Sequence, residues 1–77
     1  MASRPRIVRA VPSGPQTRPQ RGVAVVVRIH WHQGPDTEVT AVATAWTRQA
    51  VEIVWATPSG DASVDWVPAA DVRRQGF

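Results

Sequence analysis

The chain from Val23 onward alternates between apolar and polar positions. One apolar side chain stands at every second position from Val23 to Trp31. Period two is the pattern of a β-strand with one buried face, because successive side chains of a strand point to opposite sides of a sheet. Further strands are predicted at 38–46, 50–56, 62–67 and 72–74. Turn-forming residues separate the strands, most clearly Pro58 and Gly60 within 57–61.

Five short strands joined by tight turns predict an antiparallel meander. The three-residue connection at 47–49 would place Val42 opposite Val54 and Ala43 opposite Ile53. About 55 residues remain for the core once the first 22 are set aside, close to the lower limit for unaided folding. We therefore predict an all-β fold, a five-stranded antiparallel small barrel, since closure removes the exposed sheet edges.

One stretch resembles a known family. Residues 66–72, Trp-Val-Pro-Ala-Ala-Asp-Val, resemble the aromatic–aliphatic–Pro–x–x–x–Val stretch that closes SH3 domains. Trp55 and the turn at 57–61 are similar to the tryptophan strand and distal hairpin of the same family. The resemblance covers residues 53–73 and implies an SH3-like barrel over residues 23–77. The acidic–aromatic motif with which SH3 domains bind proline-rich peptides is missing, so the likeness concerns shape.

The first 22 residues differ in composition from the rest. They contain four prolines and five arginines (Arg4, Arg6, Arg9, Arg18 and Arg21) and no acid, whereas residues 23–77 carry four arginines against six acids. Prolines at this density prevent a helix, so residues 1–22 are predicted to be a disordered basic arm. A mitochondrial transit peptide is the alternative for this stretch, but such peptides act as amphipathic helices.

Composition excludes several classes of protein. The chain has no cysteine, and its longest apolar run, Val23–Val27, is far too short for a membrane span. We expect a soluble, cytoplasmic protein, and the use of arginine without lysine, with much alanine and valine, suggests a high-GC bacterial genome. No catalytic motif is recognisable, so a non-enzyme without cofactor is predicted.

His30 and His32 are the only candidate metal ligands of the nitrogen type. On a strand their spacing puts both imidazoles on one face, where Asp36 or Glu38 would complete a three-ligand site. The alternative is that both histidines lie on the solvent face and bind nothing. We expect the second arrangement, and therefore no metal.

The four tryptophans divide between the two faces of the predicted sheet. Trp31 and Trp55 fall on the apolar face, and Trp66 is expected to follow Val64 inward. Trp46 is expected on the outer face, close to Arg28 and Arg48. The alternative for Trp46 is a place at the rim of the core, with the arm folded over it. An aromatic cage for methylated lysine is less favoured, because the tryptophans are distributed over both faces.

These features predict a binding module. The favoured partner is DNA or RNA, bound by the arm through phosphate contacts and by base stacking on an outer patch. The residues predicted to bind are Arg4, Arg6, Arg9, Arg18, Arg21, Arg28, Trp46 and Arg48. The alternative is a protein–protein adaptor whose acidic partner docks on Trp46 and the Pro68 turn. The net charge of −2 on residues 23–77 weakens the nucleic-acid hypothesis without deciding between the two, and the oligomeric state stays open.

Overall fold

The computed structural model describes residues 7–75. Within them the chain forms five strands and one short 3₁₀ turn: β1 (Val23–Ile29), β2 (Thr37–Trp46), β3 (Ala50–Ala56), β4 (Ala62–Pro68), η1 (Ala69–Asp71) and β5 (Val72–Arg74). Each strand lies where alternation or turn residues predicted one. The all-β prediction with five antiparallel strands is confirmed.

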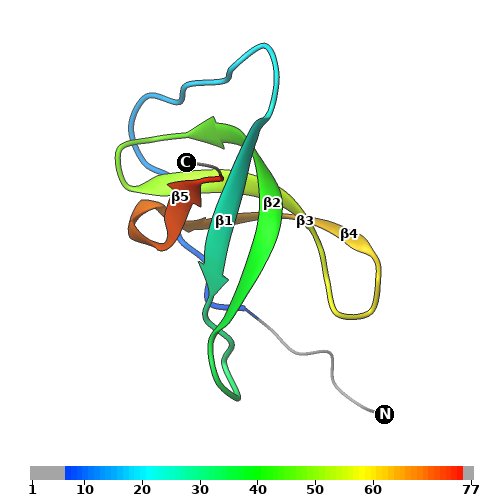
Figure 1. Cartoon of the computed structure of the whole chain (residues 1–77). Coiled ribbons are helices and arrows are strands. Elements are labelled where there is room, and N and C mark those ends of the chain that lie inside the picture. The colour runs from blue at the N-terminus through cyan, green and yellow to red at the C-terminus, as the bar shows by residue number, and fades with distance from the viewer. Residues whose placement is uncertain (1–6, 76–77) are drawn as a thin grey trace.

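The strands form one antiparallel sheet in the order β4-β3-β2-β1-β5 (Figure 1). The sheet was predicted to close into a barrel. No ladder joins β4 to β5 within residues 7–75, so the sheet is open and these strands are its edges. The physical reason lies in β5, which has only three residues and uses them to pair with β1.

The core lies on one face of the sheet and follows the alternation of the strands. β1 buries Val25, Val27 and Ile29, while β3 buries Ile53 and Trp55. The largest fully buried side chains are Ile29, Ile53, Val27 and Val67. These residues form a single cluster, which provides the main burial of apolar surface in this small fold.

The pairing of β2 with β3 confirms the predicted register and adds an irregularity. Val42 faces Val54 and Ala43 faces Ile53, as expected from the short turn. The register then shifts around Thr44, so that Ala45 faces Glu52. Such a bulge bends its strand and redirects the side chains that follow.

Trp46, beyond this bulge, is half-buried and packs against the core cluster. It lines a small hollow with Val23, Val25 and Val51, all on the core side of the sheet. The predicted outer position is therefore wrong, and the alternative at the rim of the core is correct. Val42 does lie on the outer face and is exposed.

The face assignment of β4 is also a correction. Val64 is 59% exposed and Trp66 is half-buried, whereas Asp65 and Val67 are buried. Residues directly opposite in an antiparallel pair share a face. Because Asp65 pairs with the inward Ile53, the carboxylate faces inward and Val64 faces out. Pairing with β3, rather than the apolarity of Val64, decides which side is buried.

The N-terminal arm is the largest difference from the sequence-based prediction. Residues 7–10 and Thr17 are bound to the sheet rather than lying in a disordered arm, while residues 1–6 fall outside the described part. Ile7 is only 5% exposed and forms a bridge with Trp31, and Thr17 pairs with Trp46 through two backbone hydrogen bonds of 2.8 and 2.9 Å. Figure 1 shows this segment, in blue to cyan, crossing the far side of the strands before it returns to β1.

Candidate functional site

Residues 7–10 lie as an extended segment between the end of β1 and the edge strand β4. The Val8 N–H donates to the His30 carbonyl oxygen at 2.7 Å, and the Ala10 N–H donates to the Trp66 carbonyl oxygen at 2.9 Å. The segment thus spans two strands that no ladder joins directly. We call the space that it occupies, between His30–Trp31 and Asp65–Trp66, the β1–β4 groove.

Alternate side chains of this segment point into the groove. Ile7 joins the core cluster, and Val8, the next residue, is exposed. Arg9 donates from Nε to Oδ1 of Asp65 at 2.7 Å. Period two is the geometry of a strand, so the segment is held as an added strand would be, with specificity carried by every second side chain.

Asp65 is the polar centre of the groove. Its side chain is only 4% exposed and accepts three hydrogen bonds, from Arg9 at 2.7 Å, Trp55 Nε1 at 2.9 Å and Ser63 Oγ at 2.7 Å. Burial by itself would raise the pKa of Asp65, but the hydrogen bonds and the charge of Arg9 outweigh burial and hold it below its usual range. A buried carboxylate with this set of donors is a fixed acceptor for a guanidinium.

A hollow of about 310 Å³ continues from the groove towards the turn between β3 and β4. Its walls include Trp31, Trp55, Pro58, Asp61 and Ser63, together with Ile7 and Arg9 of the segment. The two indole rings meet edge to face, with centroids 6.0 Å apart and planes at 61°. The indole nitrogens are held by Thr37 and Asp65, both at 2.9 Å, so the rings are fixed before any ligand arrives.

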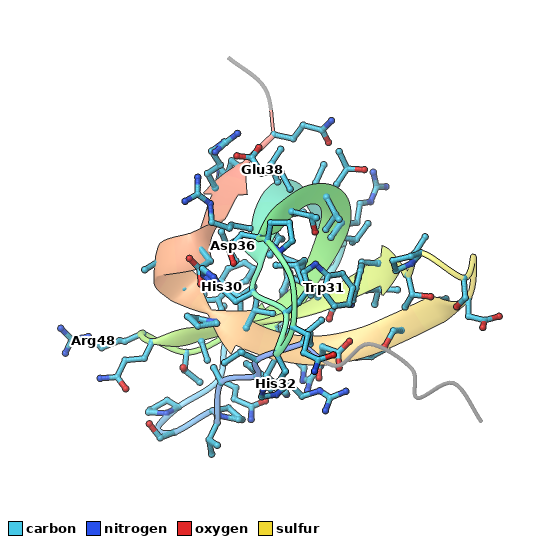
Figure 2. All side chains as sticks on the ribbon, turned by 90° about the horizontal axis from the view of Figure 1, so that it is seen from below. His30, Trp31, His32, Asp36, Glu38 and Arg48 are labelled. Carbon is cyan, nitrogen blue, oxygen red and sulfur yellow. The ribbon has the colours of Figure 1, made fainter. Side chains whose placement is uncertain are left out.

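His30 lies directly beside the groove and contacts two carboxylates. Its Nδ1 is 3.0 Å from Oδ2 of Asp36 and its Nε2 is 2.9 Å from Oδ2 of Asp71. These hydrogen bonds, first to Asp71 and then to Asp36, raise the pKa of His30. Figure 2 shows His30 directed towards Asp36 from the chain just after β1, with His32 well apart from both.

This arrangement differs from both alternatives considered for the two histidines. His30 is half-buried between acids, while His32 is exposed, so the two imidazoles do not share one solvent face. The reason is that β1 ends at Ile29, and the backbone leaves the period-two geometry before His32. Within residues 7–75, no three side chains of the metal-binding types are placed to hold one ion.

The structure separates the arginines that were predicted to act together. Arg9 is bound to Asp65, and Arg18 donates to Glu52 at 3.1 Å. Arg28 lies opposite Glu38, the second residue of β2, whereas Arg48 lies two positions beyond Trp46, the last residue of the same strand. Most of the length of β2 therefore lies between them. Arg28 does not form one patch with Trp46 and Arg48, and Figure 2 shows Arg48 far from Glu38, the residue opposite Arg28.

Only one of the other three arginines of the predicted arm lies within the described residues. Arg21 is exposed in the loop before β1, and Arg4 and Arg6 lie outside the described residues. Sequence reasoning missed the roles of Ile7, Asp65 and His30. One signal was present for Ile7, since Ile7-Val8 is the one pair of adjacent branched aliphatic residues in residues 1–22.

No protein-family model, curated protein or solved structure matches this chain. Within residues 7–75, no helix has the length and apolar character needed to cross a membrane. The geometry of the groove is therefore the feature from which a function can be inferred.

Proposed function

We propose that the protein is a non-enzymatic interaction module whose β1–β4 groove binds an extended segment of a partner protein. One observation carries the proposal: the chain's own residues 7–10 already occupy this groove as an extended segment. Backbone hydrogen bonds to His30 and Trp66 hold it on both sides. Strand addition of this kind is a common mode of peptide recognition.

The chemistry of the groove defines the ligand. The site of Ile7 takes an aliphatic side chain, and Asp65 takes an arginine two positions later. The residue between them, which corresponds to the exposed Val8, points outward, so its side chain is free to vary. The ligand pattern is therefore aliphatic–x–Arg in an extended conformation. An arginine suits Asp65 better than a lysine, because its guanidinium is planar and carries several fixed donors.

The chain's own segment competes with such a partner. A segment tethered by a short linker has an effective concentration on the order of millimolar. A separate partner of equal intrinsic affinity binds well only when this segment is displaced or weakened. In the full chain, residues 7–10 thus occupy the groove. A partner binds when its own extended segment replaces them.

We also infer an SH3-like arrangement for the strands. The order β4-β3-β2-β1-β5 and the 3₁₀ turn η1 between Pro68 and Val72 support this inference. The groove then lies beside the loop that follows the first strand and the turn between the third and fourth. Because a shared fold hosts many functions, this inference concerns architecture and adds nothing on the partner.

Nucleic-acid binding through the arm and an outer patch stays a prediction. Arg9 and Arg18 are already hydrogen-bonded to carboxylates, and Arg28 is distant from Trp46. These contacts favour the peptide ligand. The same contacts favour the adaptor class predicted as the alternative, although its docking site moves from Trp46 and Pro68 to the β1–β4 groove.

The test is a titration of the full-length chain with a capped peptide carrying the sequence of residues 6–12. The Arg9→Ala variant, in which the cis segment has lost its anchor, should bind the peptide roughly tenfold more tightly than the unaltered chain, since less of the site is occupied in cis. Binding is followed by NMR at the indole N–H signals of Trp31 and Trp55.

Two controls make the titration specific. A peptide with glutamine at its fourth position, which corresponds to Arg9, should bind much more weakly. The Arg18→Ala variant, which removes another arginine–carboxylate pair from the same arm, should behave as the unaltered chain does. Equal binding of the two peptides, or signals that move only at Trp46 and Trp66, would contradict the proposal.

A further inference from the structure

His30 connects three parts of the chain at one end of the sheet. Its ring contacts Asp36 of the loop between β1 and β2 and Asp71 of η1. Its backbone carbonyl accepts the Val8 N–H, which is one of the two backbone hydrogen bonds of the groove. The next residue, Trp31, bridges Ile7 and forms a wall of the hollow. A movement of His30 would therefore displace the carbonyl oxygen and the indole that residues 7–10 contact.

The two ring contacts require a particular protonation state. Both partner atoms are carboxylate oxygens, which accept hydrogen bonds, so both ring nitrogens must donate. An imidazolium has two N–H groups, whereas a neutral imidazole has one donor and one lone pair. When His30 loses its proton, one carboxylate is left facing a lone pair, and that contact becomes repulsive.

The other charged groups near this site come from each neighbouring element. Arg28 of β1 and Arg73 of β5 share a small hollow with Asp71, and both lie close to Glu38 of β2, at 4.0 and 2.9 Å. Among these side-chain types, histidine is the one whose ordinary pKa lies close to neutrality.

We infer that His30 is a positioning residue of the β1–β4 groove, and that the groove binds an aliphatic–x–Arg segment more tightly when His30 is protonated. This inference rests on the proposed function. The imidazolium fastens the loop after β1 to η1 and so fixes the carbonyl and the indole that the segment contacts. Deprotonation removes one of the two ring hydrogen bonds, so the loop that carries Trp31 becomes more mobile.

The experiment measures affinity as a function of pH in the full-length Arg9→Ala variant. The capped peptide of residues 6–12, which carries no titrating group in this range, is titrated between pH 5.5 and 9. Affinity should fall severalfold as pH rises, with a midpoint equal to that of the His30 ring signals. Adding His30→Gln should give a weaker, flat profile, and adding His32→Gln should leave the profile unchanged.

Asp71→Asn provides a second, directional variant. It removes the carboxylate that contributes most to the raised pKa of His30, so the midpoint should move to lower pH. A merely structural role for His30 would lower affinity equally at all pH values in this variant, although the midpoint of the His30 ring signals would still move. An affinity that is the same at all pH values would overturn the inference while leaving the groove as a peptide site.

The chain's own segment gives an independent measurement. In the unaltered protein, the Val8 N–H and Arg9 Nε–H signals should move towards their free positions with the midpoint of His30. If no peptide binds at any pH but these signals follow His30, the proposed function fails and the role of His30 in positioning the groove stands. Signals that do not change with pH would overturn that role.

Discussion

β1 and residues 7–10 are both extended and meet just beyond the C-terminal end of β1, yet they are held in different ways. β1 pairs along its whole length with β2 and along three residues with β5, and its buried side chains belong to the centre of the core. The segment has two backbone hydrogen bonds, one buried isoleucine and one ion pair. β1 cannot leave without unfolding the sheet, whereas the segment has contacts of the number and kind that a ligand makes.

The largest difference should appear between two buried isoleucines. Ile29→Ala, in β1, should lower the free energy of unfolding by about 2–5 kcal/mol, since it leaves a cavity in a close-packed core. Ile7→Ala should cost less, because its loss cannot exceed the free energy with which the segment docks. Chemical denaturation of both variants measures the difference. Equal losses would mean that the segment is an integral part of the core.

The ion pair of the segment should matter less than a core side chain. Arg9→Ala removes a charge-assisted hydrogen bond to a buried carboxylate, and we expect a loss of about 1–3 kcal/mol. Because Arg9 itself is 60% exposed, solvent screening should place the result in the lower half of that range. Asp65→Asn in the Arg9→Ala background should recover part of the loss, since the unpaired buried charge is then absent. No recovery would argue against burial of Asp65.

The lowered pKa of Asp65 predicts how the free energy of unfolding depends on pH in acid. Its folded pKa is below the unfolded value, so its contribution is complete above the unfolded pKa and is lost as pH falls through the folded one. The loss therefore begins below about pH 4. Denaturation at a series of acidic pH values should show this dependence in the unaltered chain and a shallower one in Asp65→Asn. Identical slopes would show that Asp65 does not change its pKa on folding.

The smallest effect is expected for the second arm pair. Arg18 and Glu52 lie 3.1 Å apart, but Arg18 is 59% exposed. Exposed ion pairs contribute about 0–1 kcal/mol, so Arg18→Ala should be nearly neutral in the same denaturation assay. A loss as large as that of Arg9→Ala would mean that residues 11–22 are held as firmly as residues 7–10.

The strands could be predicted because the alternation within each strand and the turn residues between strands are visible in the local sequence. The apolar residues of β1 recur with period two, and the turn at Thr57–Asp61 contains the residues that turns need. The pairs Val42–Val54 and Ala43–Ile53 were also predicted, although next to the turn Trp46 faces Val51 and the bulge restores the predicted register. These are local properties, which neighbouring residues determine.

The groove could not be predicted, because it depends on contacts between distant positions. Asp65 faces inward through its pairing with Ile53 and is satisfied by Arg9, 56 residues earlier. Trp46 turns towards the core because of a bulge that no local pattern marks. The prolines of the arm do exclude a helix, but they do not exclude an extended segment packed on a sheet, which was the possibility that the disorder prediction left out.

The central claim is that residues 7–10 occupy the β1–β4 groove in the full-length protein. NMR in solution tests it through contacts between the Ile7 methyl groups and the Trp31 ring, together with a slowly exchanging Arg9 Nε–H. We expect both in the unaltered chain, and we expect Asp65→Asn to weaken the Arg9 signal while the strand amides keep theirs. Random-coil shifts for Ile7 and Arg9, with no contact to Trp31, would contradict it.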